Sequence, residues 1–347
     1  MQNNKNKNGI SFYAAANGFT GFKSYFDEIF NYKMLEKLYI IKGGPGTGKS
    51  TFMKNIAKIY EDKGLTVDRI FCSSDPKSLD GIIVDKKVAL IDGTAPHEAN
   101  TKLPGAFDEI INLGENWNSN ELKTRKAEII EINENKSKNY SSAYKYLSFC
   151  KVLSDYIVDE TSKYFNTYRA DNLIDKITES YKIEESPRRQ TRLFSSFSKY
   201  GYLSILPHEN MKICSLFPDD FRAFCFSKYL VSKSKKFSFT EIKSPFDPLL
   251  TEGIIYESEN IYLGLSEKSE DTISITDLFN IPKEKEEELK SLTDIIKVHL
   301  STAKKYFSSA SDEHFKLEEI YKNAMAFDKN YPVLEKTLKN IDKILLL

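Results

Sequence analysis

The sequence predicts an α/β fold, with a three-layer α/β/α core around a parallel sheet, and two observations carry this prediction. Residues 38–41 and 88–91 are short apolar runs, partly β-branched, that end close to a glycine or an aspartate. Such runs are typical of strands that are buried on both faces of a sheet. Residues 51–60 follow the first run and carry apolar side chains at helical spacing. A strand, a turn and a helix in this order form the repeating unit of α/β folds.

The segment between the first strand and the first helix fits the pattern G-x-x-x-x-G-K-[ST] of a phosphate-binding loop, or P-loop. Glycines at these positions let successive backbone N–H groups turn toward a polyphosphate, which then also meets the positive end of the helix. We expect Lys49 to reach the β- and γ-phosphates and Ser50 to bind a magnesium ion. The predicted nucleotide-binding residues are Gly43, Gly44, Pro45, Gly46, Thr47, Gly48, Lys49, Ser50 and Thr51.

A second strand at residues 88–91 leads directly to Asp92. A carboxylate at the end of a buried strand next to a P-loop is suited to holding magnesium through water. Asp92 is therefore the predicted Walker B residue, and Ser50 and Asp92 together are the predicted magnesium site.

The residue that acts as catalytic base is less clear, because Gly93 occupies the position where many mechanical ATPases carry a glutamate. Asp75, His97 and Glu98 are the candidates, since each lies in a loop that follows a predicted strand. The alternative is that residues 96–98 form an ordinary polar loop and that Asp75 opens a turn. No N-K-x-D signal for guanine is evident, so ATP is preferred over GTP.

Composition limits the remaining function classes. With 347 residues the chain exceeds one typical domain, and its 50 basic residues balance its 50 acidic residues, which makes nucleic acid an unlikely partner. The four cysteines show neither zinc-site spacing nor the density of a disulfide scaffold. No stretch approaches the ~20 apolar residues of a membrane helix, and residues 1–9 are polar. We therefore expect a cytoplasmic protein that does not enter a membrane.

An internal repeat organises the rest of the chain. A shift of 172 positions places Asp75-Pro76 on Asp247-Pro248 and residues 81–83 on residues 253–255. The segment that then aligns with the P-loop, residues 215–222, has no glycine and has Phe221 in place of the lysine. The prediction is a P-loop domain at residues 1–187 and a degenerate copy without nucleotide binding at residues 188–347.

Each half continues into a polar, helical stretch, at about residues 119–183 and 282–347. Apolar and aromatic residues at helical spacing indicate long helices, either antiparallel hairpins packed on the cores or a dimerisation arm. The arginines of residues 188–192, at the junction of the halves, are interpreted as a linker, with an arginine finger as the alternative.

Taken together, these motifs resemble an uncharacterised bacterial family of P-loop ATPases or nucleotide kinases. Its members look like tandem duplications, and the matching positions here are residues 43–51, 73–81 and 92–97. The resemblance implies ATP and Mg²⁺ as ligands. The segment D-G-T-A-P-H at residues 92–97 also resembles the switch of dimeric ATPases that deliver cargo, which allows for a homodimer.

Three functions remain open at this point. The first is a magnesium-dependent ATPase that acts on a partner protein through one working site. The second is a kinase that transfers the γ-phosphate to a nucleotide or small-molecule acceptor. The third is a nucleotide-gated binding module with little turnover.

Overall fold

The computed structural model describes residues 9–95, 98–183, 188–205, 211–266 and 271–347. The chain divides into two compact units, and each contains one main sheet. Unit 1 comprises Met1–Ala15, Phe22–Ser142 and Lys305–Leu347, and unit 2 comprises Ala16–Gly21 and Ala143–Lys304.

The division differs from a simple split of the sequence into halves. The predicted boundary between residues 187 and 188 lies inside unit 2. The observed boundaries fall after Ala15, after Gly21, and within the helices α4 (Lys126–Ser162) and α7 (Lys283–Asn323). At 37 residues, α4 is about 55 Å long at the rise of an α-helix, which exceeds the width of a small domain. A helix of this length cannot be covered by the core of one unit alone.

The sheet of unit 1 has the strand order β1-β5-β6-β7-β4-β8 among the described residues. Strand β6 is antiparallel to both of its neighbours, and the other pairs are parallel. The prediction of a parallel sheet was wrong in this respect, since the sheet is mixed. Its strands are β1 (Ser11–Tyr13), β4 (Lys37–Lys42), β5 (Val67–Phe71), β6 (Leu79–Val84), β7 (Val88–Asp92) and β8 (Asp108–Asn112).

The reason lies in the short connection between β6 and β7. Only three residues separate the strands, and Asp85 and Lys86 both have positive φ angles, of 48° and 56°. A connection this short joins antiparallel strands, because a parallel pair needs a crossover of a dozen residues or more. The strong apolar character of β6 does not reveal its direction.

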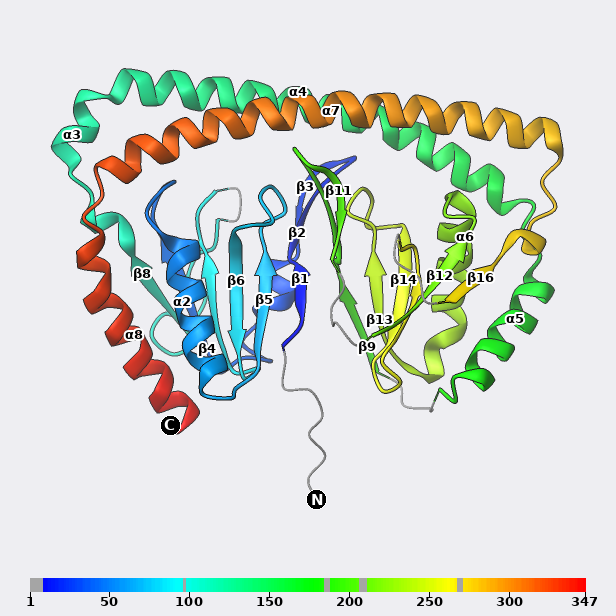
Figure 1. The fold of residues 1–347 in the computed structure, drawn as a ribbon, viewed down its shortest axis with the longest axis horizontal. Coiled ribbons are helices and arrows are strands. Elements are labelled where there is room, and N and C mark those ends of the chain that lie inside the picture. The colour runs from blue at the N-terminus through cyan, green and yellow to red at the C-terminus, as the bar shows by residue number, and fades with distance from the viewer. Residues whose placement is uncertain (1–8, 96–97, 184–187, 206–210, 267–270) are drawn as a thin grey trace. The chain divides into compact units, whose positions relative to one another are not determined.

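Helices α2 (Lys49–Asp62) and α8 (Asn330–Leu345) pack together on the sheet of unit 1 (Figure 1). Met53 and Ile56 of α2 and Ile341 of α8 are fully buried in this core. The Tyr60 hydroxyl donates a hydrogen bond to the Asp342 carboxylate at 3.0 Å. The C-terminal helix therefore completes the core beside the glycine-rich segment that joins β4 and α2.

The sheet of unit 2 has the order β16-β12-β15-β14-β13-β9, and β14 is antiparallel to its neighbours. Arg188–Arg192 form strand β9, which pairs with β13 in parallel, so the interpretation of this segment as a linker was wrong. The other strands are β12 (Lys212–Phe217), β13 (Ser238–Lys243), β14 (Thr251–Tyr256), β15 (Ile261–Gly264) and β16 (Asp271–Ser274).

Helices α5 (Thr167–Ser180) and α6 (Phe221–Lys233) contribute to the core of unit 2. The smaller elements of the chain complete the two units. They are β2 (Ala15–Gly18), β3 (Gly21–Ser24), α1 (Phe26–Ile29), η1 (Leu113–Asn116), α3 (Ser119–Thr124), β10 (Ser195–Ser198), β11 (Gly201–Ser204), η2 (Ser234–Lys236), η3 (Thr276–Leu278) and η4 (Phe327–Lys329).

The predicted long helices are present, but they pair differently from the expected hairpins. Within unit 1, Tyr140 of α4 packs edge-on against Phe307 of α7, with ring centroids 5.8 Å apart. Ile132, two turns earlier on α4, packs with Leu317 and Ile320 further along α7, so the two helices are antiparallel. Among the described helices, none combines the length and the apolar character needed to cross a membrane.

The core of unit 2 contains a buried carboxyl group, that of Glu252 on β14. Its side chain accepts a hydrogen bond of 2.6 Å from the Ser195 hydroxyl and is almost fully buried. Burial raises the pKa of Glu252 to about 7. The folded protein therefore keeps the proton of this carboxyl group up to a higher pH than the unfolded chain does.

Replacing Glu252 with glutamine is expected to flatten the pH dependence of stability. In the wild type the unfolded chain loses this proton near its ordinary pKa and the folded chain only near 7, so stability falls between these values by an amount on the order of 3 kcal/mol. Urea unfolding at a series of pH values measures this slope. The exposed Glu284→Gln serves as the control, and an unchanged slope in Glu252→Gln would contradict the assignment.

Candidate functional site

Three glycines shape the loop between β4 and α2. Gly43, Gly46 and Gly48 have φ angles of 151°, 71° and 87°, which side chains with a β-carbon rarely adopt. Gly48 is the N-cap of α2, and no side chain caps the helix there. The N–H groups of the first turn of a helix have no partner within the helix. This helix start is therefore suited to an anion.

The side chain of Lys49 lies inside the loop. Its ammonium group donates hydrogen bonds to the carbonyl oxygens of Gly43 and Gly44, both at 2.8 Å. The same nitrogen lies 3.6 Å from Oδ2 of Asp92. Strands β4 and β7 are parallel neighbours with Ile41 opposite Asp92, so both strands end at the same edge of the sheet. The structure thus brings together the predicted lysine and the predicted aspartate.

The carboxylate of Asp92 is fixed by two hydrogen bonds from Thr94. Its Oδ1 accepts hydrogen bonds from the backbone N–H of Thr94 at 2.9 Å and from the Thr94 hydroxyl at 2.5 Å. Burial raises the pKa of Asp92, and the nearby charge of Lys49 opposes this rise. Asp80 adds a second negative charge in the neighbourhood and raises the pKa of Asp92 further. A cation at this place would favour the ionised form.

The donor set at the start of α2 fits magnesium. Mg²⁺ takes oxygen ligands, keeps several waters and uses one or two protein groups together with substrate phosphates. Ser50 provides a hydroxyl oxygen, which accepts a hydrogen bond from the Leu79 N–H at 3.0 Å, and Asp92 provides a carboxylate. Among the described residues, no three His, Cys, Asp or Glu side chains form a group that could hold a metal by themselves. Magnesium would therefore depend on phosphate oxygens for the rest of its shell.

The other predicted loop residues have structural positions. Thr47 is fully buried, and its hydroxyl donates to the Gly44 carbonyl oxygen at 2.9 Å. Pro45 is half-buried, and Thr51 is exposed on the first turn of α2. The carbonyl oxygen of Thr47 accepts a hydrogen bond of 3.3 Å from the Asn330 amide at the start of α8. The loop is thus fixed by contacts of its own and by a residue from the end of the chain.

Two of the predicted catalytic bases, Asp75 and Glu98, lie in the loops that follow β5 and β7. Asp75 accepts hydrogen bonds from the Lys77 N–H at 3.3 Å and the Ser78 hydroxyl at 2.9 Å, so it closes its own turn. Glu98 is exposed in the loop after β7. His97 lies outside the described residues.

Helix α7 covers the loop within unit 1. A β-carbon added to Gly46 would lie 2.5 Å from the Glu318 carbonyl oxygen and 3.2 Å from the Lys322 nitrogen. The rings of Trp117 and Tyr321, with centroids 5.1 Å apart, lie beside Gly44. Glycine is therefore needed here for close approach of the helix as well as for backbone conformation.

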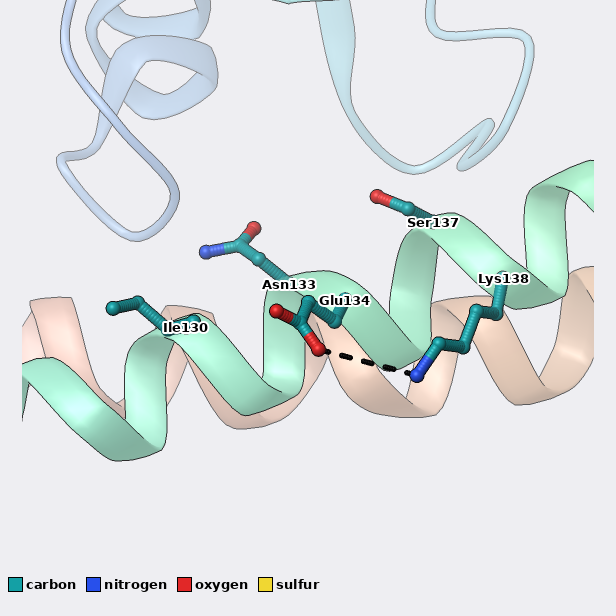
Figure 2. A pocket seen from close by; sticks show the side chains of 5 residues that line it. All are labelled: Ile130, Asn133, Glu134, Ser137 and Lys138. Carbon is teal, nitrogen blue, oxygen red and sulfur yellow. Dashed lines mark ion pairs between the residues drawn. The ribbon is translucent and has the colours of Figure 1, made fainter.

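An open surface depression of about 470 Å³ runs along α4. Figure 2 shows that Asn133 and Ser137 point toward the loops of the unit 1 sheet, whereas Glu134 and Lys138 form an ion pair of 3.9 Å. Tyr140, on the same helix, is hydrogen-bonded to Ser74 in the loop after β5. Tyr140 thus links α4 to the loop after β5.

The loop before α6 in unit 2 places a carboxylate at the start of its helix. Between β12 and α6, Asp220 is the N-cap, and its carboxylate accepts a hydrogen bond from the Arg222 N–H at 2.9 Å. The Arg222 side chain also pairs with Asp220, at 2.6 Å. A carboxylate of the chain itself thus occupies the start of this helix.

Sequence reasoning missed the residues that surround the P-loop from distant segments. Trp117, Glu318, Tyr321 and Asn330 lie between about 70 and 280 positions from the loop, and no local pattern links them to it.

Comparison of the chain with family models, with curated proteins and with solved structures found no match. The functional argument therefore depends on the geometry of the site.

Substituting Gly46 with alanine is expected to destabilise unit 1 more than substituting Gly105, which provides a matched control. Both residues have positive φ angles, of 71° and 77°, but an added β-carbon meets nothing within 4 Å at Gly105. The backbone strain is therefore shared, and the contact with α7 adds a cost of about 1–3 kcal/mol in Gly46→Ala alone. Thermal unfolding compares the two variants, and equal losses would contradict the close packing of α7.

Proposed function

We propose that this protein binds ATP with magnesium at residues 43–51 and hydrolyses it, with one working site in each chain. One observation carries the proposal. The Lys49 ammonium group, the uncapped start of α2 and the Asp92 carboxylate meet at one edge of the unit 1 sheet. This combination of a cation, inward N–H groups and a magnesium ligand is what a nucleoside triphosphate requires.

The present partners of Lys49 support this proposal. Two of them are neutral carbonyl oxygens, and the carboxylate of Asp92 lies at 3.6 Å, beyond hydrogen-bond distance. Phosphate oxygens are stronger acceptors for an ammonium group than carbonyl oxygens are. Ser50 and Asp92 would hold the magnesium ion, which neutralises charge on the phosphates during transfer.

We infer further that unit 2 is a copy of unit 1 that has lost its phosphate site. Both sheets have the same strand order when their strands are counted along the chain. The equivalent strands β6 and β14 both carry an acidic residue followed by Gly-Ile-Ile, at residues 80–83 and 252–255. The carboxylate of Asp220 now fills the helix start where the phosphate would bind. This explains why one site per chain is proposed.

Helix α7 is the element through which hydrolysis would act on a partner protein. Its C-terminal part lies on the P-loop, at Gly46, and its N-terminal part belongs to unit 2. A change of the loop between ATP and ADP would therefore move a rigid helix that extends beyond unit 1. The proposed setting is the cytoplasm, where ATP is available.

A kinase is the second candidate, and the polar side chains on the open surface depression along α4 are the observation behind it. Its polar side chains Asn133 and Ser137 point toward the loops of the sheet, where an acceptor would need hydrogen-bond partners. Phosphate release without any added acceptor distinguishes an ATPase from a kinase.

Lys49→Ala is expected to lower ATP affinity by about 10- to 100-fold, because it removes a charged hydrogen-bond donor to the phosphates. Phe221→Ala, at the equivalent position of unit 2, should leave the affinity unchanged. Equilibrium binding of a fluorescent ATP analogue measures both variants. Equal losses in the two variants would exclude the one-site proposal.

Asp92→Asn is expected to separate binding from turnover. The change removes one negative magnesium ligand, so kcat should fall by about 100-fold while the affinity for ATP changes by less than about five-fold. Phosphate release at saturating ATP and magnesium gives kcat. Unchanged turnover in the variant would show that Asp92 is not the magnesium ligand.

A further inference from the structure

The proposed hydrolysis needs a group beside the terminal phosphate that activates or orients the attacking water, and of the expected candidates the structure describes Asp75 and Glu98. Gly93 follows Asp92, Asp75 closes its own turn, and Glu98 is exposed. The alternative is a carboxylate from another element that lies near both Lys49 and the loop.

Glu318 on α7 meets both conditions. Its turn of the helix lies directly on the loop, because its carbonyl oxygen would be 2.5 Å from a β-carbon at Gly46. Its carboxylate interacts electrostatically with the Lys49 ammonium group, which marks the expected place of the γ-phosphate. The side chain is half-buried, so it is partly shielded from bulk water.

A second group on α7 holds the Glu318 carboxylate. His314 lies one turn earlier, and its Nε2 is 3.5 Å from Oε1 of Glu318. His314 lowers the pKa of Glu318, and the charges of Lys322 and Lys49 act in the same direction. Glu318 is ionised at neutral pH, as an ordinary glutamate is, and its carboxylate can accept a proton. A base oriented by a third group is the usual arrangement for activating a nucleophile.

We propose that Glu318 is the general base of the ATPase reaction and that His314 positions it. This inference rests on the proposed function. As the water oxygen forms a bond to the γ-phosphorus, Glu318 accepts a water proton. The bond from the γ-phosphorus to the oxygen bridging it to the β-phosphate breaks, and ADP keeps that electron pair. The products are ADP and inorganic phosphate, and Glu318 returns its proton to solvent.

Neighbouring carboxylates of α7 provide matched controls. Glu319 is exposed, and Glu313 forms an ion pair of 2.7 Å with Lys316. Neither has a described contact with the phosphate loop. Glu319→Gln therefore changes the same charge on the same helix without changing the site.

Glu318→Gln is expected to lower kcat for phosphate release by about 100-fold or more, the usual contribution of a general base, while ATP binding is retained or tightened. The glutamine has nearly the same shape, and retained ATP binding shows that the variant is folded. Glu319→Gln should keep the wild-type rate. Glu318→Asp, which restores the carboxylate, should recover part of the turnover.

His314→Gln tests the positioning role through the pH profile of kcat. Without His314 the pKa of Glu318 should rise, because its largest lowering influence is gone, and the acid limb of the profile should move to higher pH. Lys322 and Lys49 still face the carboxylate in this variant. An unmoved acid limb would contradict the role of His314.

The outcomes separate this inference from the proposed function. Hydrolysis that survives at half the wild-type rate or more in Glu318→Gln overturns the role of Glu318 and leaves the ATPase proposal intact. A rate above that of the wild type also overturns it, because the carboxylate would then be restraining Lys49. A wild-type protein that binds ATP but releases no phosphate overturns both.

Discussion

The close packing of α7 on the glycine-rich loop is the constraint on which the site depends. The Glu318 carbonyl oxygen lies so near Gly46 that no other residue fits there. Helix α7 begins in unit 2 and ends in unit 1. The loop consists of residues near position 46, and residues near position 320, in the unit 1 part of α7, cover it. Gly46 therefore serves two structural needs, which are a positive φ angle and the close approach of a helix.

The helix that follows a strand starts differently in the two units, at α2 in unit 1 and at α6 in unit 2. A helix start carries N–H groups without partners and attracts negative charge. In unit 2 the carboxylate of Asp220 satisfies it, and Arg222 balances that carboxylate. In unit 1 the N-cap is Gly48, which has no side chain to offer, so the start of α2 is suited to an anion from outside. The two units thus differ in whether a carboxylate of the chain itself caps the start of the helix.

Local patterns in the sequence were sufficient for the elements near the loop, and long-range pairings were not predictable. The strand before Gly43, the helix after Gly48 and the strand ending at Asp92 were all predicted, because hydrophobic periodicity and glycine spacing are local signals. The direction of β6 was missed, because a buried apolar run has the same residue pattern in a parallel and in an antiparallel strand. The position of Glu318 near the loop was not predicted, because no sequence pattern around it indicates proximity to Lys49, which lies about 270 positions away.

A calorimetric titration of the full-length protein with ATP and magnesium tests the central claim most directly, because it measures affinity and stoichiometry together. The account predicts one ATP bound per chain, since unit 1 offers an uncapped helix start with Lys49 and unit 2 fills its own with Asp220. The absence of binding, or two ATP molecules per chain, would contradict it.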